Sequence, residues 1–318
     1  MRALAARRPA IAVVAVWILA ACSALAIPAC GAPQAGTGTG PPGQRPASRA
    51  GPSSGRGPTS GSDRRAASRR PAAKASRLPG GLDARLAAAL APVVRHHAGS
   101  LAVSIADPAA GAAATYRGGV LFDTASIVKA DILAVLLLQH QQLGLGLSGQ
   151  DQGLAAAMIE DSDNQAASAL WNAVEGGPGM EAGNATLGLR NTWPQADGLW
   201  GMTTTSAADQ LRLLADLTSP RSPLSAPARS YELSLMRHVE PSQRWGVAAA
   251  ADPGTRPAVK DGWLPVGPQG TWIINSIGVI GHAGQPLLIA VLSSGQPSES
   301  AGIRQVQAAA LAATAAIG

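Results

Sequence analysis

The stretch that decides the fold lies between residues 258 and 293 and reads AVKDGWLPVGPQGTWIINSIGVIGHAGQPLLIAVLS. Three runs in it have the composition of strands: Ala258 to Leu264, Thr271 to Ile280 and Pro286 to Ser293. Turn segments, Gly267 to Gly270 and Gly281 to Gln285, separate the runs, and short glycine-rich connections of this kind close hairpins. The stretch therefore predicts three consecutive antiparallel strands.

Two further strands and two helices are expected outside this block. Apolar residues between 82 and 94 recur at helical spacing, and residues 301 to about 315 form a closing helical pattern. Residues 101–105 and 113–116 alternate around the Asp107-Pro108 turn, which is typical of a hairpin. The terminal helices are expected to cover the sheet.

The middle of the chain is mostly helical in pattern. A long apolar helix is expected from about Ser126 to Gln142, and residues 150–240 keep helical spacing between Gly/Pro loops. The fold class is thus α/β in the α+β sense. We expect an antiparallel five-stranded sheet flanked by terminal helices, with an all-α subdomain inserted between strands two and three.

Charge separates the 318-residue chain into two parts. Residues 1–80 hold 12 Lys and Arg against one acid, whereas residues 81–318 hold 13 against 18 acids. The pI near 10.1 therefore belongs to the N-terminal segment, and the folded part, being mildly acidic, is not expected to bind nucleic acid. Both cysteines, Cys22 and Cys30, precede residue 31, which excludes disulfides and cysteine chemistry from the rest of the chain.

The N-terminus has the features of an export signal. Arg2, Arg7 and Arg8 precede an apolar run that ends in Leu19-Ala20-Ala21-Cys22. This ending resembles the lipobox of bacterial lipoproteins, in which the cysteine becomes the acylated N-terminus. Cys22 is the expected lipid anchor of an exported protein that faces outward from the cell membrane.

Three alternatives for this segment stay open. Cleavage after Ala24-Leu25-Ala26 would release a secreted protein, Ile27-Pro28-Ala29-Cys30 is a second lipobox-like site, and the apolar run could persist as an anchor helix. We divide the chain into a signal and lipobox region (1–30), a Pro/Gly/Ser/Arg linker without a core (31–78) and one folded domain (79–318).

Ser126-Ile127-Val128-Lys129 carries the first chemical signal. At a spacing of three on the first helical turn, both side chains share a face, and the helix N-terminus adds positive potential. An amine whose pKa is lowered can take the proton of a hydroxyl and make it a nucleophile. Taken alone, the motif is a weak signal, and an ordinary solvated helix start is the better interpretation of it.

Two more motifs follow in order. Ser162-Asp163-Asn164 stands between two helical patterns, and the first late strand carries Lys260-Asp261-Gly262. Each has a structural alternative, since Ser, Asp and Asn all cap helices and Lys260 could be an exposed strand lysine. The set of three in this order argues for a shared site.

With these elements, residues 82–318 resemble the superfamily of class A β-lactamases and penicillin-binding proteins, close to the actinobacterial serine hydrolase lipoproteins. The Asn275 to Gly278 strand and the terminal helix extend the resemblance. It implies a transpeptidase-like fold and an active-site serine that works without cofactor or metal. The partner would be a small-molecule or peptide substrate, and the protein a monomer.

The resemblance also implies the role of each site residue. Ser126 would attack an amide carbonyl, with Lys129 as its proton acceptor. Ser162 and Lys260 would pass a proton to the leaving nitrogen. Asn164 would bind the substrate amide, and Gly262, with Asp261 beside it, would let the substrate lie close to the strand edge. The backbone N–H groups of Ser126 and Trp263 would bind the oxyanion.

The sequence departs from the family pattern in three places. The stretch from Asn191 to Thr205, where class A enzymes carry a Glu that activates water, contains Asp197 as its single acid. Asp261 replaces the usual Thr or Ser that binds a substrate carboxylate, and would repel that group. The segment between Lys129 and Ser162 is also shorter, which predicts a more open site.

Two functions are compatible with these features. The first is an exported serine amide hydrolase or acyl transferase acting on β-lactams or D-Ala-type wall peptides. The second is a lipoprotein that retains the fold as a binding module with weak or no catalysis, which the missing Glu and Asp261 favour. His96-His97, which end the first helix, are expected to complement the helix dipole rather than to bind a metal.

Overall fold

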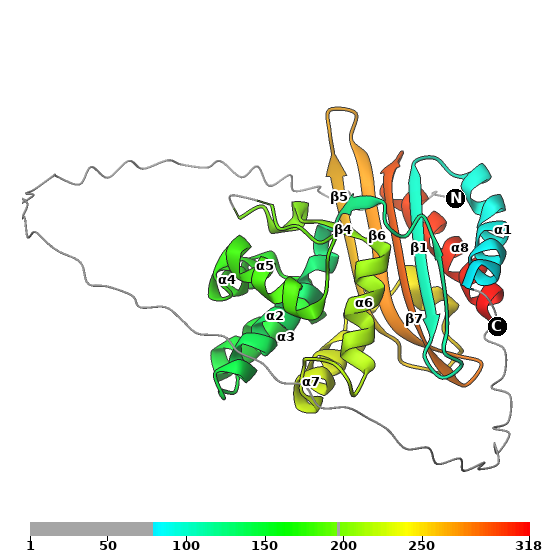
Figure 1. The fold of residues 1–318 in the computed structure, drawn as a ribbon. Helices are drawn as coiled ribbons and strands as arrows, with labels where there is room; N and C mark the ends of the chain where they lie inside the picture. The colour runs from blue at the N-terminus through cyan, green and yellow to red at the C-terminus, as the bar shows by residue number, and fades with distance from the viewer. Residues whose placement is uncertain (1–78, 196–197) are drawn as a thin grey trace, which may run out of the picture. The chain divides into compact units, whose positions relative to one another are not determined.

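A five-stranded antiparallel sheet is the centre of the computed structural model, which describes residues 79–195 and 198–318 (Figure 1). The strand order is β2-β1-β7-β6-β5, so β5 forms one edge. The strands are β1 (Ser100–Asp107), β2 (Ala112–Tyr116), β5 (Ala258–Val266), β6 (Thr271–His282) and β7 (Gln285–Gln296). The predicted three-strand block and the N-terminal hairpin are both confirmed.

Two terminal helices cover one face of this sheet. Helices α1 (Pro79–His96) and α8 (Glu299–Ile317) pack against each other, and α8 also contacts β1, β6 and β7 (Figure 1). Ser298 caps α8 by accepting a hydrogen bond from the backbone N–H of Ala301 over 3.2 Å. The predicted sandwich of sheet and terminal helices is therefore confirmed.

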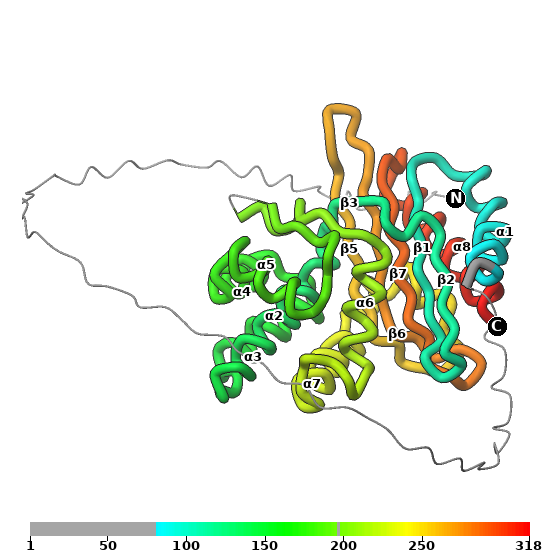
Figure 2. Tube along the Cα trace, viewed as in Figure 1, coloured from blue at the N-terminus to red at the C-terminus, as the bar shows by residue number. Residues whose placement is uncertain are grey.

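The all-α insertion lies between β2 and β5 in the chain, as expected. Its helices are α2 (Val128–Gln142), α3 (Gly149–Glu160), α4 (Asn164–Ala173), α5 (Gly176–Leu187), α6 (Ala207–Thr218) and α7 (Ala226–Arg237). Every residue of α2 from Val128 to Leu138 is buried. A helix that is apolar on all sides belongs inside a bundle, and α2 contacts α3, α4, α5 and α7 (Figure 2).

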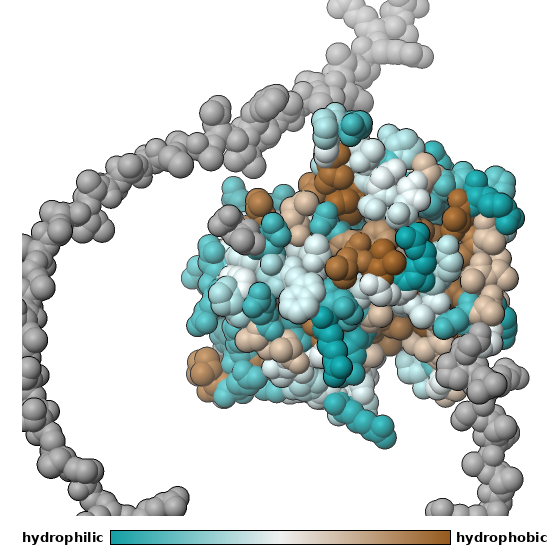
Figure 3. Space-filling model, turned by 45° about the horizontal axis from the view of Figure 1, so that its top comes forward, coloured by the Kyte–Doolittle hydropathy of each residue, from teal (hydrophilic) through white to brown (hydrophobic). Residues whose placement is uncertain are grey.

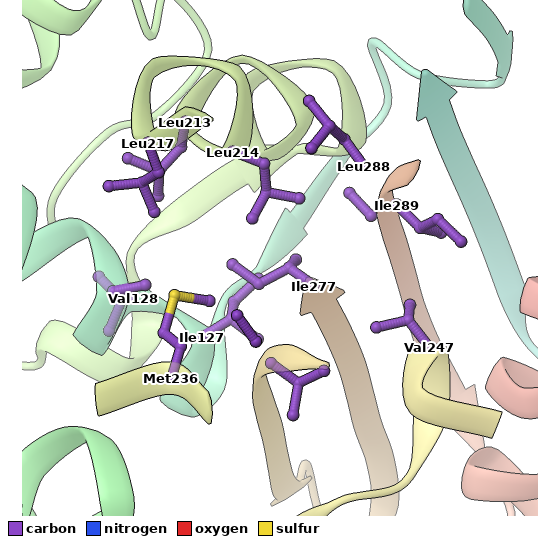
Figure 4. Packing of buried hydrophobic residues seen from close by; sticks show 14 of the residues in the cluster. Ile127, Val128, Leu213, Leu214, Leu217, Met236, Val247, Ile277, Leu288 and Ile289 are labelled. Atoms are coloured by element: carbon purple, nitrogen blue, oxygen red, sulfur yellow. The ribbon is translucent and has the colours of Figure 1, made fainter. Parts of the chain in front are cut away.

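The hydrophobic core joins the insertion to the sheet. Helix α6 contributes Leu213, Leu214 and Leu217, which face Ile277 of β6 and Leu288 of β7 (Figure 4). Side chains from the start of α2 and from α7 reach the same cluster. Because this packing fixes α2 against the sheet, the first turn of α2 and the edge strand β5 are held at a defined separation.

Two features differ from the sequence expectation. A second sheet pairs β3 (Leu121–Asp123) with β4 (Thr204–Ser206), and three-residue strands are too short to show a period. The long helix begins at Val128 rather than at Ser126, because Ala125–Ile127 form a 3-10 turn, η1. The corrected boundary places Ser126 on a turn that leads into α2.

Some expectations fall outside the described residues. The signal region with Cys22, the linker 31–78 and Asp197 all belong to that part of the chain. Within residues 79–195 and 198–318, none of the helices combines the length and the apolarity that crossing a membrane requires. His96, in the last turn of α1, has its Nδ1 2.7 Å from the carbonyl oxygen of Pro92.

Candidate active site

Ser126 sits on a backbone that its neighbours hold in place. Ala125, directly before it, has a φ of 47°, in the left-handed region that non-glycine residues rarely adopt. Asn275 of β6 donates from Nδ2 to the carbonyls of Asp123 and Thr124, over 2.8 and 2.9 Å. The sheet thereby anchors the turn that presents Ser126, and strain of this kind is concentrated at functional sites.

The Ser162 loop approaches from the α3–α4 connection. Ser162 has a φ of 56°, and Asp163 caps α4 by accepting from the backbone N–H of Ala166 over 2.6 Å. The expected capping role in this motif is thus filled by Asp163. The cap leaves the hydroxyl of Ser162 free to face the two lysines.

Lys129 is buried and directed at this loop. Its Nζ donates to the Ser162 carbonyl over 2.6 Å, to Ser162 Oγ over 3.0 Å and to Asn164 Oδ1 over 2.7 Å. Among the described residues, none makes a hydrogen bond with the Ser126 hydroxyl, Lys129 included. The structure therefore places Lys129 at the expected site but pairs it with Ser162 and Asn164.

Lys260 completes the group from the edge strand. It is buried, and its Nζ donates to Ser162 Oγ over 3.1 Å and to the carbonyl of Asp261 over 3.1 Å. The alternative interpretation of Lys260 as an exposed strand lysine is thereby excluded. The hydroxyl of Ser162 lies between two amines that come from α2 and β5.

Burial shifts the pKa of both amines. Desolvation and, to a smaller extent, the charge of Lys260 lower the pKa of Lys129 to about 7, and the charge of Asp163 acts against both. Desolvation also lowers the pKa of Lys260, with Asp261 acting against it. An amine that titrates near neutral pH can accept a proton, which an ordinary lysine cannot do at that pH.

Gly262 brings β5 against the Ser126 turn. A Cβ at this position would lie 2.8 Å from the backbone nitrogens of both Ser126 and Ile127, and 3.0 Å from the Thr124 carbonyl. No side chain fits there, because real Cβ atoms do not approach backbone that closely. The space beside the Ser126 N–H, where an oxyanion would bind, is therefore open only because residue 262 is glycine.

The Asp261 side chain is directed at Ser276 of β6 and at the backbone of Trp245. Its side chain is fully buried and accepts hydrogen bonds from Ser276 Oγ and from the backbone N–H of Trp245, the latter over 3.1 Å. Burial raises the pKa of Asp261, while Ser276, Lys260 and Trp245 act against that rise. Asp261 thus sits within the site as a buried acidic group next to Lys260.

One tryptophan contacts the lysine pair, and two others pack against each other. The Lys129 ammonium lies 5.0 Å from the centroid of the half-buried Trp200 ring, within the range of a cation–π contact. Trp263 packs edge-on against Trp245, with 6.0 Å between ring centroids. Trp200 therefore gives the Lys129 ammonium an aromatic neighbour.

Sequence reasoning missed several of these contributors. The sequence places Asn275 and Ser276 in a strand motif without indicating a role for either, and it indicates none for Trp200. Two consecutive polar residues inside the apolar run TWIINSIGVI were a usable signal, since buried polar groups are hydrogen-bonded to something. The contact of Trp200 with Lys129 leaves no such signal.

Comparisons with known proteins identify the family to which the domain belongs. A family model described as "Beta-lactamase enzyme family" matches residues 137–317, more than half of the chain. The chain belongs to this family. Since the match begins after Ser126 and Lys129, the assignment rests on the remainder of the domain.

Curated relatives of this family member come from mycobacteria. Proteins named "Putative lipoprotein LppW" in Mycobacterium tuberculosis and Mycobacterium bovis are 29% identical over 221 residues. The alignment covers 64% of this chain and 66% of each relative. The chain thus spans slightly less than two thirds of the length of these relatives.

Solved structures place the family fold on the described domain. A β-lactamase from Chitinophaga pinensis has a TM-score of 0.65 at 17% identity, covering 73% of this chain and 99% of that one. A β-lactamase from Xanthomonas campestris has a TM-score of 0.62 at 20% identity, covering 75% and 99%. At such identities the likeness shows a shared fold, which confirms the predicted resemblance and architecture.

Proposed function

We propose that this family member is an exported serine hydrolase or acyl transferase that is acylated on Ser126 by an amide such as a β-lactam or a D-Ala-type peptide. The observation that carries the proposal is the meeting of Lys129, Lys260 and Ser162 beside the strained Ser126 turn. Burying two amines lowers the stability of a fold, and buried groups with shifted pKa values are concentrated at functional sites.

Acylation would proceed in two proton-balanced steps. Ser126 Oγ bonds to the carbonyl carbon while its proton passes to the neutral amine of Lys129. The resulting oxyanion is stabilised by the backbone N–H groups of Ser126 and Trp263. As the C–N bond breaks, Ser162 donates its proton to the leaving nitrogen, and the adjacent lysine ammonium groups resupply Ser162.

Deacylation is expected to be slow. The chain between Asn191 and Thr205 supplies no Glu to activate water, and Asp197 stands outside the described residues. Without a positioned base, the hydrolysis of the ester on Ser126 is slower by a factor that is typically 10² to 10⁴. A long-lived acyl-enzyme of the penicillin-binding type follows.

A binding module is the second candidate. One observation favours it: all three hydrogen bonds of Lys129 go to Ser162 and Asn164, and among the described residues none goes to Ser126. A protein of this kind would hold a ligand in the cleft without forming an ester. Covalent labelling separates the two functions.

The test is the mass of the purified chain after incubation with penicillins, cephalosporins and a D-Ala-D-Ala peptide. A stable increase equal to one bound acyl group supports the acylating enzyme. Decay of the adduct within seconds would indicate a β-lactamase with efficient turnover. Unchanged mass with every compound, with none of the compounds hydrolysed, would favour the binding module.

Export and anchoring are part of the same proposal. The relatives carry a lipoprotein name, and the Leu19 to Cys22 segment resembles a lipobox. We propose that Cys22 is acylated and holds the domain outside the cell membrane on the 31–78 segment. Acylation supplies about 0.8 kcal/mol of membrane affinity per buried CH₂.

A further inference from the structure

Trp200 lies in a segment that is fixed to the Ser126 turn, and the following inference rests on the proposed function. The 3-10 turn η2 (Trp200–Met202) contacts η1, which carries Ser126. The backbone N–H of Thr124 donates to the Thr203 carbonyl over 2.8 Å, and Thr124 Oγ1 donates to the Gly201 carbonyl over 3.4 Å. The backbone after Trp200 is therefore held by a residue that lies two positions before Ser126.

The indole ring of Trp200 is also held from α4. Its Nε1 donates to Ser168 Oγ over 3.1 Å, and Ser168 Oγ donates to the Asn164 carbonyl over 3.0 Å. Asn164 is the residue whose Oδ1 accepts a hydrogen bond from Lys129. The orientation of the ring is thus fixed by the helix that begins at a partner of Lys129.

The ring covers one side of the Lys129 amine. Nζ lies 5.0 Å from the ring centroid. An ammonium has three N–H donors, and all three of the hydrogen bonds of Lys129 go to Ser162 and Asn164. Lys129 is fully buried, whereas Trp200 is half-buried. The ring therefore separates the amine from the solvent.

Exposed apolar side chains accompany the ring and the serine in the chain. Leu199 precedes Trp200 and is 56% exposed, and Leu121, in the strand that leads to the Ser126 turn, is 50% exposed. On the face shown in Figure 3, hydrophobic residues gather below the projecting β5–β6 hairpin. The segments that carry Trp200 and Ser126 thus offer water few hydrogen-bond partners.

The ring has two opposing effects on the amine. Its face attracts an ammonium ion, which raises the pKa of Lys129 by about one pH unit. Its bulk keeps water from the amine, and complete burial lowers a lysine pKa by up to about 3–5 pH units. Desolvation is the largest of the causes that lower the pKa of Lys129 to about 7. Exclusion of water is therefore the stronger of the two effects.

Charged groups also act on the amine, from other elements. In the described structure these are Lys260 of β5, which lowers the pKa of Lys129, and Asp163 of the α3–α4 connection, which raises it. A substitution at residue 200 leaves both charges in place. Its effect on Lys129 consequently reports the access of water to the amine.

We propose that Trp200 is a positioning residue, which excludes water from the Lys129 amine and so keeps it able to accept the Ser126 proton at neutral pH. The ring acts through Lys129 and does not itself react. Its hydrogen bond to Ser168 holds it in place over the amine.

The first test measures the titration of Lys129 without any substrate. The chain contains three lysines, Lys74, Lys129 and Lys260, so the full-length protein labelled with [ε-¹³C]lysine gives a simple spectrum, and Lys260→Arg assigns the signals. Trp200→Ala is expected to raise the midpoint of Lys129 by about one pH unit or more. Trp200→Gln, a second variant that binds water, is expected to shift it in the same direction.

Two further variants serve as comparisons. Trp200→Phe keeps a ring over the amine and loses the Nε1 donor, and its midpoint is expected to stay within about half a pH unit of wild type. Trp193→Ala removes a 55% exposed ring that lies in a surface pocket with Glu181 and Arg190. This variant is expected to titrate as wild type.

The second test follows acylation by benzylpenicillin methyl ester, which has no carboxylate to titrate, by intact mass between pH 5.5 and 9. In Trp200→Ala the rate constant is expected to fall about fivefold at pH 7 and to stay within about twofold of wild type at pH 9. A merely structural role would lower the rate constant equally at every pH.

Several results would overturn the inference. They are an unchanged or lowered midpoint in Trp200→Ala and Trp200→Gln, an equal shift in Trp200→Phe, and an equal loss of rate at every pH. Failure of the proposed function is a separate result. If neither the methyl ester nor a fluorophosphonate modifies wild type at any pH, acylation of Ser126 is excluded, while the lysine titration still shows whether Trp200 keeps water from Lys129.

Discussion

Lys129 and Lys260 donate from their Nζ atoms to the same oxygen, Ser162 Oγ, over 3.0 and 3.1 Å. One residue comes from the first turn of α2 and the other from the edge strand β5. Two like charges so close disfavour one another, and the charge of Lys260 lowers the pKa of Lys129. One amine of the pair can therefore be neutral near pH 7.

Acylation is expected to rise with pH through the pKa of Lys129. The pKa is lowered to about 7, so the amine is protonated and unable to accept a proton below that pH, and becomes a base above it. The rate constant for acylation by benzylpenicillin methyl ester should increase between pH 5.5 and 8.5 with a midpoint near 7. A flat profile over this range would exclude Lys129 as the base.

Gly262→Ala is expected to abolish or strongly slow acylation. The added Cβ lies 2.8 Å from the Ser126 nitrogen, so it fills the oxyanion space, and loss of such a donor lowers rates by about 10²- to 10³-fold. Gly119→Ala, where nothing lies within 4 Å, is the matched control. Equal acylation rates of the two variants would mean that the oxyanion does not bind at this position.

Asn275→Ala is expected to destabilise the fold by about 1–3 kcal/mol, because the carbonyls of Asp123 and Thr124 lose their donor in a buried setting. It should also slow acylation, since the Ser126 turn loses its tie to β6. Urea unfolding measures the first effect and intact mass the second. If the variant has the same free energy of unfolding as wild type, the strained turn does not depend on Asn275.

Two buried acidic side chains, one on α2 and one on α7, predict that the stability of the fold depends on pH. The carboxylates of Asp131 and Glu232 are fully buried, and neither these nor the Asn184 amide has a hydrogen-bond partner in the described structure. Burial raises the pKa of Asp131 to about 7 and that of Glu232 well above its usual value. Their favourable contribution is present below about pH 4 and is lost as the pH rises through 7.

Asp131→Asn removes this titration. The free energy of unfolding of the variant, relative to wild type, should increase between pH 5 and pH 8 by about 1–3 kcal/mol. Glu175→Gln, an exposed carboxylate without side-chain hydrogen bonds, serves as the control and should follow wild type. If the free energy of unfolding depends on pH in the same way in Asp131→Asn and in wild type, Asp131 does not titrate as a buried group.

Anchoring is tested by the two cysteines. Cys22→Ala should abolish incorporation of radiolabelled palmitate and release the protein from the membrane fraction, whereas Cys30→Ala should leave both unchanged. Loss of label in Cys30→Ala alone would move the anchor to the second lipobox-like site. Absence of label in the wild-type chain would favour cleavage after Ala26 or an anchor helix.

Much of the architecture could be predicted from the sequence because its signals are local. Strand periodicity between 258 and 293, and the apolar run of α2, each follow from residues that are neighbours in the chain. The 3-10 turn at Ser126 could not be predicted, since it depends on Asn275 holding the preceding carbonyls from another strand. The β3–β4 pair depends on a similarly distant contact.

The site residues were identified by motif, whereas their partners depended on the fold. The expected pairing of Lys129 with Ser126 follows from spacing on an ideal helix, and the pairing with Ser162 and Asn164 follows from where the α3–α4 connection lies. Asp261 was expected to face a substrate carboxylate. It is instead held by Ser276 and Trp245, which no local pattern reveals.

The central claim is that Ser126 forms a covalent ester, and peptide mapping after labelling tests it most directly. The purified chain is treated with a fluorophosphonate and with benzylpenicillin methyl ester, digested and sequenced by mass spectrometry. One modified peptide is expected, carrying its added mass on Ser126, and no modification of Ser126→Ala. An unmodified chain, or a label that persists in Ser126→Ala, would contradict it.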